Sequence, residues 1–345
     1  MAVTRADVAA LAGVSPALVS YVINGGPRPV SAQARRRIEV AIETLGYRPN
    51  AIASALRGGM TRTIGLLTPS PTNPFFAELA ESLVVELFER GNTLSIGVTN
   101  DDPEREALYL RSYLDRRVDG FIVTSSRAVQ SLRRVHADPV PVVVVDRIDP
   151  NESVSSVHVD NVQAATYATE HLQGHGHRTI GCIVGTWPVV NSAERVAGWR
   201  AQQERIGADC SDAYVEHAEF TSAGGREATF ALLGPAARRR ASRSSEPTAL
   251  FVASDAQAFG VVMACVELGL RVPQDVAIVS IDGTSAARFC QPSLTSVRQP
   301  VVDIARTAVS HLLELIAQRD APPHHTVLHG NLVVGTSCGC PGELV

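Results

Sequence analysis

Residues 4–24 contain two short runs of hydrophobic residues at helical spacing, separated by a glycine. In the first run Val8, Leu11 and Ala12 lie three and four residues apart, so they form one apolar stripe along a helix. Gly13 follows this run and permits the positive φ angle at which helices commonly end. The pattern predicts a helix that stops at Gly13 and buries the face carrying these three residues.

A second helix is predicted to begin directly after this break. Ser15 can cap its first turn, and Pro16 suits the first helical position. Leu18, Val19 and Val22 repeat the apolar spacing, so the two stripes can pack against each other. Short helices joined in this way are typical of the helix-turn-helix motif, whose second helix enters the major groove of DNA.

The outward side of the second helix would carry the residues that face the groove, namely Pro16, Ala17, Ser20 and Tyr21. An ordinary helical hairpin has the same spacing and is the alternative for this segment taken alone.

A third helix is predicted to complete a small all-α domain. Ser31 is placed to cap this helix and Gly46 to end it. Its apolar stripe consists of Ile38, Ala41, Ile42 and Leu45.

A further short helix is predicted after Pro49, with Asn50 as its cap and Ala53 and Leu56 three residues apart on one face. Residues 1–62 hold eight arginines and three acidic residues, a net charge of +5, whereas the whole chain carries −4. A basic head on an acidic body is typical of a module that binds phosphates. The run 35–37 of three arginines is equally consistent with a solvated helix face.

From Thr63 onward, apolar strands alternate with amphipathic helices in two successive series. This order predicts parallel sheets with helices on both faces, and two sheets in tandem predict two lobes. The polar, arginine-rich stretch 234–247 is predicted to be a surface loop. The expected strands are 64–67, 94–98, 121–123, 142–145, 179–184, 249–253 and 276–281, and the expected helices are 74–90, 103–117, 128–136, 161–171, 193–205 and 256–268.

Composition fits a large globular chain. Its 345 residues are 45% hydrophobic and 5% aromatic, which is enough to bury more than one core. No stretch approaches the roughly 18 apolar residues of a membrane helix, and residues 1–7 lack a secretory pattern. We therefore expect a cytoplasmic protein.

The six cysteines lack the paired spacing of metal ligands. Cys338 and Cys340 form the one close pair, and no histidine pattern accompanies them, so reduced structural thiols and no metal are expected. His175 and His177 are compatible with a metal site, but two histidines at a helix end are more often helix-terminal cations. Catalytic motifs such as a nucleophile elbow, a Walker loop or a Gly-rich dinucleotide turn are missing, so we expect neither an enzyme nor a cofactor.

The chain resembles the LacI/GalR family of bacterial transcriptional regulators along nearly its whole length. One motif alone would be weak evidence, but their shared order is specific. The segments that carry the resemblance are 4–24, 30–57, 73–79, 118–123, 159–161, 170–172, 176–177, 195–199, 254–255, 281–283, 292–297 and 337–339.

The resemblance implies an N-terminal all-α helix-turn-helix head at 1–46, a linker with a hinge helix at 47–60, and an effector-binding and dimerisation domain at 61–345. This α/β domain would have two lobes of the periplasmic-binding-protein type. The N-lobe would comprise about 61–158 and 298–326, and the C-lobe about 159–297 and 327–345. No heptad joins two dimers at the C-terminus, so a homodimer is expected.

The family pattern also implies contacts with double-stranded operator DNA, including a leucine of the hinge helix that wedges between base pairs in the minor groove. Pro16 and Ala17 depart from the usual long polar side chains, which leaves more of the base reading to Tyr21. The expected DNA-contacting residues are Thr4, Ser15, Pro16, Ala17, Ser20, Tyr21, Asn24, Arg28, Ser31, Arg35, Asn50, Ala53 and Leu56.

A small-molecule effector is expected in the crevice where the carboxyl ends of the strands meet. Carboxylates and a guanidinium beside aromatic faces favour a sugar or sugar derivative, with a purine or another metabolite as the alternative. Ser254 stands where many sugar-binding members carry asparagine, and Asp255 could instead cap the next helix. The expected effector-binding residues are Phe75, Phe76, Thr124, Asp146, Arg147, Arg195, Phe220, Ser254, Asp255, Asp282 and Gln299.

Overall fold

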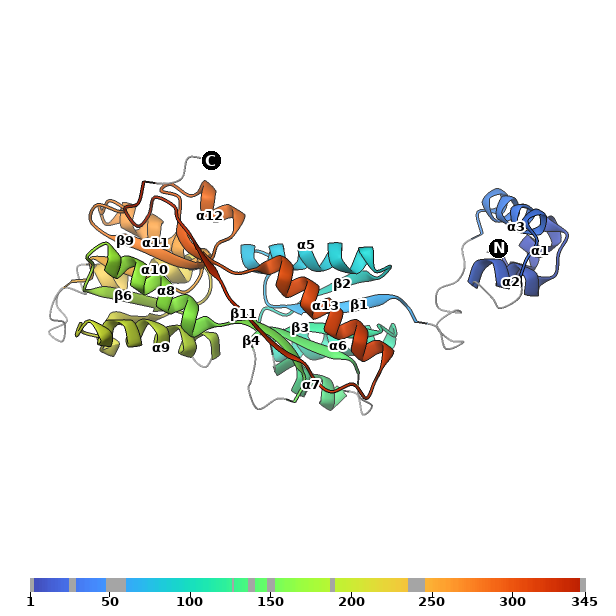
Figure 1. Ribbon diagram of the computed structural model, residues 1–345, viewed down its shortest axis with the longest axis horizontal. Coiled ribbons are helices and arrows are strands. Elements are labelled where there is room, and N and C mark those ends of the chain that lie inside the picture. Colours follow the sequence, from blue (N-terminus) through green and yellow to red (C-terminus); the bar gives the residue numbers. More distant parts are fainter. Residues whose placement is uncertain are drawn as a thin grey trace. The chain divides into compact units, whose positions relative to one another are not determined.

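The computed structural model describes residues 3–24, 29–47, 60–125, 127–135, 140–147, 153–186, 190–234 and 246–341. The chain divides into two compact units, a head at Met1–Thr61 and a body at Arg62–Val345 (Figure 1). Arg28, Asn50, Ala53 and Leu56 lie outside the described residues, as does the side chain of Asn24.

The described residues of the head form the helices α1 (Arg5–Ala12), α2 (Pro16–Asn24) and α3 (Ala32–Leu45). The predicted helix ends are confirmed, because Gly13 and Gly46 follow α1 and α3 at φ angles of 65° and 60°. Ser15 and Ser31 cap α2 and α3, each accepting a hydrogen bond from the backbone N–H three residues later at 3.3 Å. The turn residues of the described head helices therefore act as the sequence predicts.

One detail of the head core differs from the prediction. Val8, Ala9 and Ala12 are buried in α1, whereas Leu11 is 54% exposed. The buried stripe of α1 is thus centred on the side of Ala9, because α3 packs there with Ile38 and Ala41. The prediction that Leu11 belongs to the core is wrong.

The first sheet of the body has the strand order β11-β5-β4-β3-β1-β2, with every adjacent pair parallel. Helices α5 (Pro74–Glu89) and α13 (Val301–Ala317) share the core on one face, and α6 (Pro103–Asp115) and α7 (Arg127–Val135) share that on the other (Figure 1). The strands are β1 (Thr63–Thr68), β2 (Thr93–Val98), β3 (Gly120–Ser125), β4 (Val142–Arg147), β5 (Ser155–Val159) and β11 (His325–Leu328).

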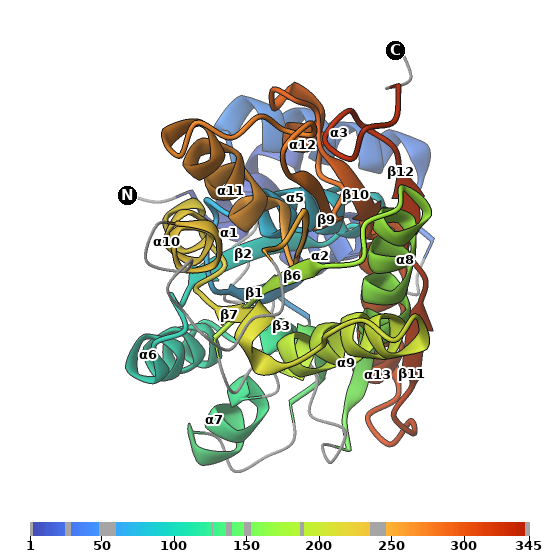
Figure 2. The ribbon, with the colours of Figure 1, turned by 90° about the vertical axis from the view of Figure 1, so that its left-hand side faces the viewer.

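The second sheet has the order β12-β10-β9-β8-β6-β7 and is parallel except for β12 against β10. Helices α8 (Asn161–Gly174) and α9 (Val190–Arg205) cover one face, while α10 (Ser222–Leu233), α11 (Asp255–Glu267) and α12 (Ser285–Phe289) cover the other (Figure 2). The strands are β6 (Ile180–Val184), β7 (Val215–His217), β8 (Ala249–Val252), β9 (Ala277–Asp282), β10 (Thr295–Arg298) and β12 (Asn331–Val333), and a 3₁₀ turn, η1, spans Asp212–Tyr214.

The described chain crosses between the sheets at 159–161, 298–301 and 328–331. The third crossing follows β11, which ends at Leu328, whereas the sequence placed the end of that N-lobe segment near 326. Both sheets keep their carboxyl strand ends close to these crossings, which positions the loops that carry the candidate site.

Among the described residues, no single helix is both long and apolar enough to cross a bilayer. Helix α1 and the adjoining Pro16–Ile23 reach that length and apolar character together, but they are bent by 105° relative to each other.

The head core supplies a direct comparison of a buried and an exposed apolar side chain. Val8→Ala is expected to destabilise the head by about 1–3 kcal/mol, since Val8 is wholly buried. Leu11→Ala should change its stability by less than about 0.5 kcal/mol. Hydrogen exchange of the α1–α3 amides in the full chain measures both effects, and equal losses of protection would contradict the assignment of the core.

Candidate functional site

A cavity of about 610 Å³ lies where the carboxyl strand ends of the two sheets meet, and residues of both lobes line it. A smaller pocket of about 20 Å³ adjoins it deeper between the lobes. The two spaces share Asn73, Phe76, Arg147 and Phe220. They form one cleft with a wide outer part and a narrow inner part.

Nine of the eleven predicted effector residues line the inner pocket. Their assembly follows from the fold, because most of them lie at strand ends or at the helix turns beside those ends. Binding of an effector by these residues stays a prediction. The nine are Phe75, Phe76, Asp146, Arg147, Arg195, Phe220, Ser254, Asp282 and Gln299.

Thr124 is not part of the cleft lining. Its side chain is buried, and its hydroxyl donates a hydrogen bond to the carbonyl oxygen of Leu67 at 3.2 Å. It therefore joins β3 to β1, and the structure offers no surface through which it could touch a ligand.

Asp255 is also absent from the lining, although it follows a strand end. Its carboxylate is wholly buried and accepts hydrogen bonds from the hydroxyls of Ser280, Ser296 and Thr284 at 2.6–2.8 Å, and from the backbone N–H of Thr284. It does not cap α11 either, since the hydroxyl of Ser254 accepts the hydrogen bond from Gln257 N at that helix start. Asp255 instead fastens the start of α11 to β9 and β10.

Asp146 at the end of β4 makes a contact between the lobes. It accepts a hydrogen bond of 2.7 Å from the side-chain amide of Asn191 on α9, and its φ angle is 72°, a strained value for a non-glycine residue. Burial raises the pKa of this carboxyl, against the opposing charges of Arg147 and Arg195. The contact between the lobes is thus made by Asp146, a carboxyl group whose charged form is disfavoured by burial.

Asn191 was not predicted as a site residue, yet it lines the inner pocket. Its side-chain oxygen is buried and has no hydrogen-bond partner among the described residues. It lies four residues before Arg195, on the same face of α9, and this spacing was the signal that could have revealed it.

Arg195 is 3% exposed and donates to two neutral oxygens, the side-chain oxygen of Asn161 at 2.9 Å and the carbonyl oxygen of Ala253 at 2.5 Å. Asp282 accepts hydrogen bonds from Gln299 Nε2 at 2.9 Å and from the backbone N–H of Asp255 at 3.2 Å, and its φ angle is 117°. Burial and the neighbouring charge of Asp255 raise the pKa of Asp282 well above its ordinary value, while Arg195 opposes the shift.

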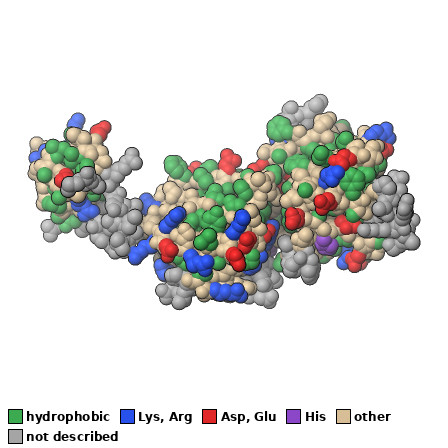
Figure 3. Space-filling view, turned by 180° about the vertical axis from the view of Figure 1, so that it is seen from behind, with side chains coloured by type: hydrophobic (Ala, Val, Ile, Leu, Met, Phe, Trp, Pro, Cys, Tyr) green, Lys and Arg blue, Asp and Glu red, His purple; other side chains and the backbone are tan. Residues whose placement is uncertain are grey.

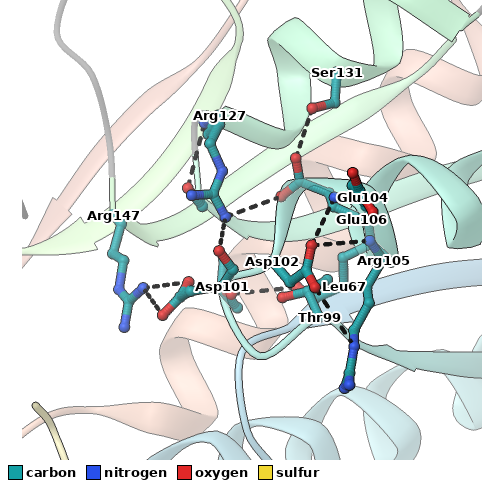
Figure 4. A network of polar contacts seen from close by, with 12 residues as sticks. Leu67, Thr99, Asp101, Asp102, Glu104, Arg105, Glu106, Arg127, Ser131 and Arg147 are labelled. Carbon is teal, nitrogen blue, oxygen red and sulfur yellow. Dashed lines mark hydrogen bonds and ion pairs between the residues drawn. The ribbon is translucent and has the colours of Figure 1, made fainter.

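Arg147 stands between the outer and inner parts of the cleft. Its Nη1 donates to both carboxylate oxygens of Asp101, at 2.8 and 2.9 Å (Figure 4). Its guanidinium carbon lies 5.8 Å from the ring centre of Phe76 and 5.9 Å from that of Phe220, one ring from each lobe. Asp101 is a second cleft residue that the sequence did not single out.

Asp101 is itself held by a polar network beside the cleft. Arg127 Nη2 donates to its backbone carbonyl at 2.9 Å, and the buried carboxylate of Glu106 accepts a hydrogen bond from Ser131 at 2.7 Å (Figure 4). This network fixes the loop between β2 and α6, so the orientation of Arg147 is set from outside the pocket.

In the head, the structure places the predicted DNA residues on and around α2. Pro16, Ala17 and Arg35 are exposed, and Ser20 and Tyr21 are partly exposed. Thr4 forms a capping box with Asp7 at the start of α1, so part of its role is structural.

The cysteines differ from their prediction in one respect. Cys338 and Cys340 are free thiols, but His171 and His175 lie beside them, with His171 Nε2 3.2 Å from Cys338 Sγ. The prediction that no histidine pattern accompanies this cysteine pair was wrong, because the partners are 167 residues apart in sequence. His177 bonds Thr248 instead, at 2.9 Å.

Residues 4–50 match the family model described as bacterial regulatory proteins, lacI family, and residues 169–338 match a periplasmic binding protein-like domain. The chain is 35% identical to catabolite control protein A of Priestia megaterium over 313 residues. This alignment covers 90% of this chain and 91% of that protein. It is 34% identical over 317 residues to the ribose operon repressor of Escherichia coli K12, covering 91% and 93%.

The chain belongs to the lacI family of bacterial regulatory proteins. As a member of this family it is a DNA-binding transcriptional repressor with an effector-binding domain, not an enzyme. It superimposes on the lac repressor dimer bound to operator and the anti-inducer ONPF with a TM-score of 0.85, at 25% identity, over 98% of this chain and 99% of that one. The regulator CelR in complex with cellobiose gives 0.72 at 30% identity, over 97% and 99%.

The raised pKa of Asp282 predicts how the stability of the chain depends on pH. As pH rises, the Asp282 carboxyl loses its proton at a lower pH in the unfolded chain than in the folded one. The free energy of unfolding therefore falls with rising pH, from the ordinary aspartate pKa up to the raised pKa of the folded chain. Asp282→Asn should weaken that fall in stability and raise the melting temperature at neutral pH, because asparagine has no proton to lose in this range. Its side-chain oxygen can accept the hydrogen bond from Asp255 N, and its NH₂ group can donate to Gln299 once the Gln299 amide has rotated.

Asp275 is the matched control, since hydrogen bonds from Arg271 lower the pKa of that exposed carboxyl. Its contribution to stability is lost as pH falls, so Asp275→Asn should slightly lower the melting temperature at neutral pH. Melting temperatures between pH 4 and 8 compare both variants with the parent chain. An unchanged pH dependence in Asp282→Asn would show that this carboxyl is not destabilising the fold.

Proposed function

We propose that this lacI-family regulator binds its operator as a dimer and that a sugar or sugar derivative, held between the lobes, sets its operator affinity. The observation that carries the proposal is the convergence of Asp146, Arg195 and Asp282 from both lobes beside Phe76 and Phe220. A cytoplasmic location belongs to the same proposal.

The polar groups of the inner pocket suit a ligand with several hydroxyls. The unpartnered oxygen of Asn191 and the carboxylates can accept hydrogen bonds, while Arg195 and Arg147 can donate them. The aromatic rings supply the apolar faces that sugar rings use for stacking. The similarity to a cellobiose-bound regulator and to the ribose operon repressor supports this ligand class.

A nucleobase is the alternative ligand. The planar guanidinium of Arg147 lies between Phe76 and Phe220, so a flat heterocycle could take a similar place between the rings. A sugar is favoured because the inner pocket offers more hydrogen-bond acceptors than the edge of a nucleobase has donors to pair with them.

The proposed switch uses the hydrogen bonds that already join the lobes. Asn191 donates to Asp146, and Ser285 at the start of α12 donates from its N–H and hydroxyl to Glu78 of α5, both at 2.7 Å. A ligand that takes over the Asn191–Asp146 contact favours one arrangement of the lobes over another. Such differential affinity is what couples the cleft to the head.

Exposed apolar side chains support the dimer. Val85 and Phe88 on α5 are 52% and 77% exposed, and Met263 and Val266 on α11 are 60% and 73% exposed. Hydrophobic side chains gather in patches on both lobes in Figure 3. Apolar surface of this extent on two neighbouring lobes is typical of a face that a second subunit covers.

The DNA-binding part of the proposal is tested in the head. Tyr21→Ala should reduce the preference for the gene's own upstream DNA over a scrambled duplex by about 1–3 kcal/mol, because it removes a base contact. Arg35→Ala should weaken both duplexes alike and lower the salt slope by about one, because it removes a phosphate contact.

Fluorescence anisotropy of labelled duplexes measures these affinities. Arg205→Ala on α9, an exposed arginine of the body, is the matched control and should bind both duplexes as the parent chain does. Indistinguishable affinities for the two duplexes in the parent chain at moderate salt would refute sequence-specific binding.

The ligand-binding part is tested with a panel of monosaccharides, disaccharides and nucleosides. We expect at least one saccharide to raise the melting temperature of the parent chain, and Arg195→Ala to bind that saccharide at least tenfold more weakly. Arg200→Ala is the control on the same helix, since Arg200 pairs with the exposed Asp212 outside the cleft. Equal binding by Arg195→Ala would show that the pocket lies elsewhere.

A further inference from the structure

Two histidines and two cysteines of the C-lobe come together outside the cleft. His171 lies in the last turn of α8 and His175 is its C-cap, while Cys338 and Cys340 belong to the segment after β12. Their four ligand atoms all lie within 4.8 Å of one another. None of these residues lines the described cleft.

The distances are close to those of a tetrahedral metal site. Nε2 of His171 is 3.2 Å from Cys338 Sγ and 3.8 Å from Cys340 Sγ, and Nε2 of His175 is 3.1 Å from Cys340 Sγ. Around zinc, with Zn–N near 2.0–2.1 Å and Zn–S near 2.3 Å, ligand atoms are about 3.3–3.8 Å apart. A small contraction of the widest pair would complete the tetrahedron.

Local sequence explains why the four side chains face one point. His171 and His175 are four residues apart and therefore share one side of the helix end. Gly339 between the cysteines has a φ of 96°, which a glycine adopts without strain, and this turn lets both sulfurs face the histidines. The Cys-x-Cys spacing is one residue shorter than the usual pair, and Gly339 compensates for it.

The cysteine segment is anchored before it reaches the histidines. The hydroxyl of Ser337 donates to the carbonyl oxygen of Ile278 at 2.7 Å and accepts from the N–H of Thr295 at 2.9 Å. The segment is thus tied to β9 and β10, so the positions of the two thiols are fixed by the sheet. Preorganised donors of this kind bind a metal without ordering new backbone.

The donor atoms also have suitable chemistry. Each of the four residues offers one ligand atom, an imidazole nitrogen or a thiol sulfur. Neutral imidazole and thiolate are the ligands that zinc prefers in closed structural sites.

We propose that His171, His175, Cys338 and Cys340 form a closed structural site for a zinc-type divalent cation. The ion would join the C-terminal end of α8 to the segment that follows β12, and so fix this segment on the C-lobe. With four protein ligands it has no open position for a substrate. The site is independent of DNA binding and of the effector.

The full-length chain, purified with zinc and then desalted, tests the proposal. Elemental analysis should find one zinc per chain, and cobalt added to the metal-free protein should give the visible absorption of a tetrahedral thiolate site. Cys340 is partly exposed and His175 is exposed, so Cys340→Ser and His175→Ala should lose both signals while keeping the helical circular dichroism. Cys210→Ser and His177→Ala are matched controls and should keep both signals.

Chelation supplies a second readout. Removal of the ion should lower the melting temperature of the parent chain and of the two controls, and should leave Cys340→Ser unchanged. The proposal is overturned if the parent chain takes up neither zinc nor cobalt in stoichiometric amount. It is equally overturned if Cys340→Ser retains the metal, or if mass analysis shows a disulfide between Cys338 and Cys340 in the reduced preparation.

Discussion

The buried charge of Arg195 is the constraint on which the cleft depends. Its guanidinium is almost wholly removed from water, and its described hydrogen bonds run to two neutral oxygens. The acids whose pKa it influences are Asp146 on one lobe and Asp282 on the other: burial raises both pKa values, and Arg195 opposes both shifts. A buried cation that interacts with acids of both lobes couples the electrostatic energy of the cleft to the arrangement of the lobes.

The surrounding geometry follows from this constraint. Asp146 and Asp282 both adopt positive φ angles, which cost free energy for residues other than glycine and persist only where neighbouring contacts enforce them. Asp255 supplies such contacts for Asp282, because its four hydrogen bonds lock the adjoining turn and its N–H donates to the Asp282 carboxylate. The acidic residues that line the inner pocket are thus supported by a residue that does not line it.

Local sequence signals predicted most of the fold. Gly13, Ser31 and Gly46 set the ends of the head helices because caps and left-handed glycines act within one turn of chain. Leu11 was misassigned because helical spacing identifies an apolar stripe but not which neighbour covers it. The hydrophobic pattern did not predict strands β5, β7 and β10–β12 or helix α12, which are only three to five residues long. It also missed helices α10 and α13, each of which follows one of these short strands, β7 and β10.

The site was predictable where one rule applied and not elsewhere. Parallel strands end at one edge of a sheet, so Asp146 and Asp282 could each be placed at the carboxyl edge of its own sheet, and the two-lobed family pattern brings these two edges to one crevice. That rule also included Asp255 and Thr124, because it does not say whether a side chain faces the cleft or the core. Asn191 could have been found from its spacing, since it lies four residues before Arg195 on α9. The pairing of His171 with Cys338 depends on tertiary packing across 167 residues, which no local pattern records.

The central claim is that occupancy of the cleft and occupancy of the operator are coupled. It is tested most directly by measuring the operator affinity of the parent chain with and without a saturating concentration of a saccharide that binds it. The account predicts that the two dissociation constants differ by about 5–150-fold, corresponding to a coupling free energy of about 1–3 kcal/mol. Identical dissociation constants at full saccharide occupancy would contradict it.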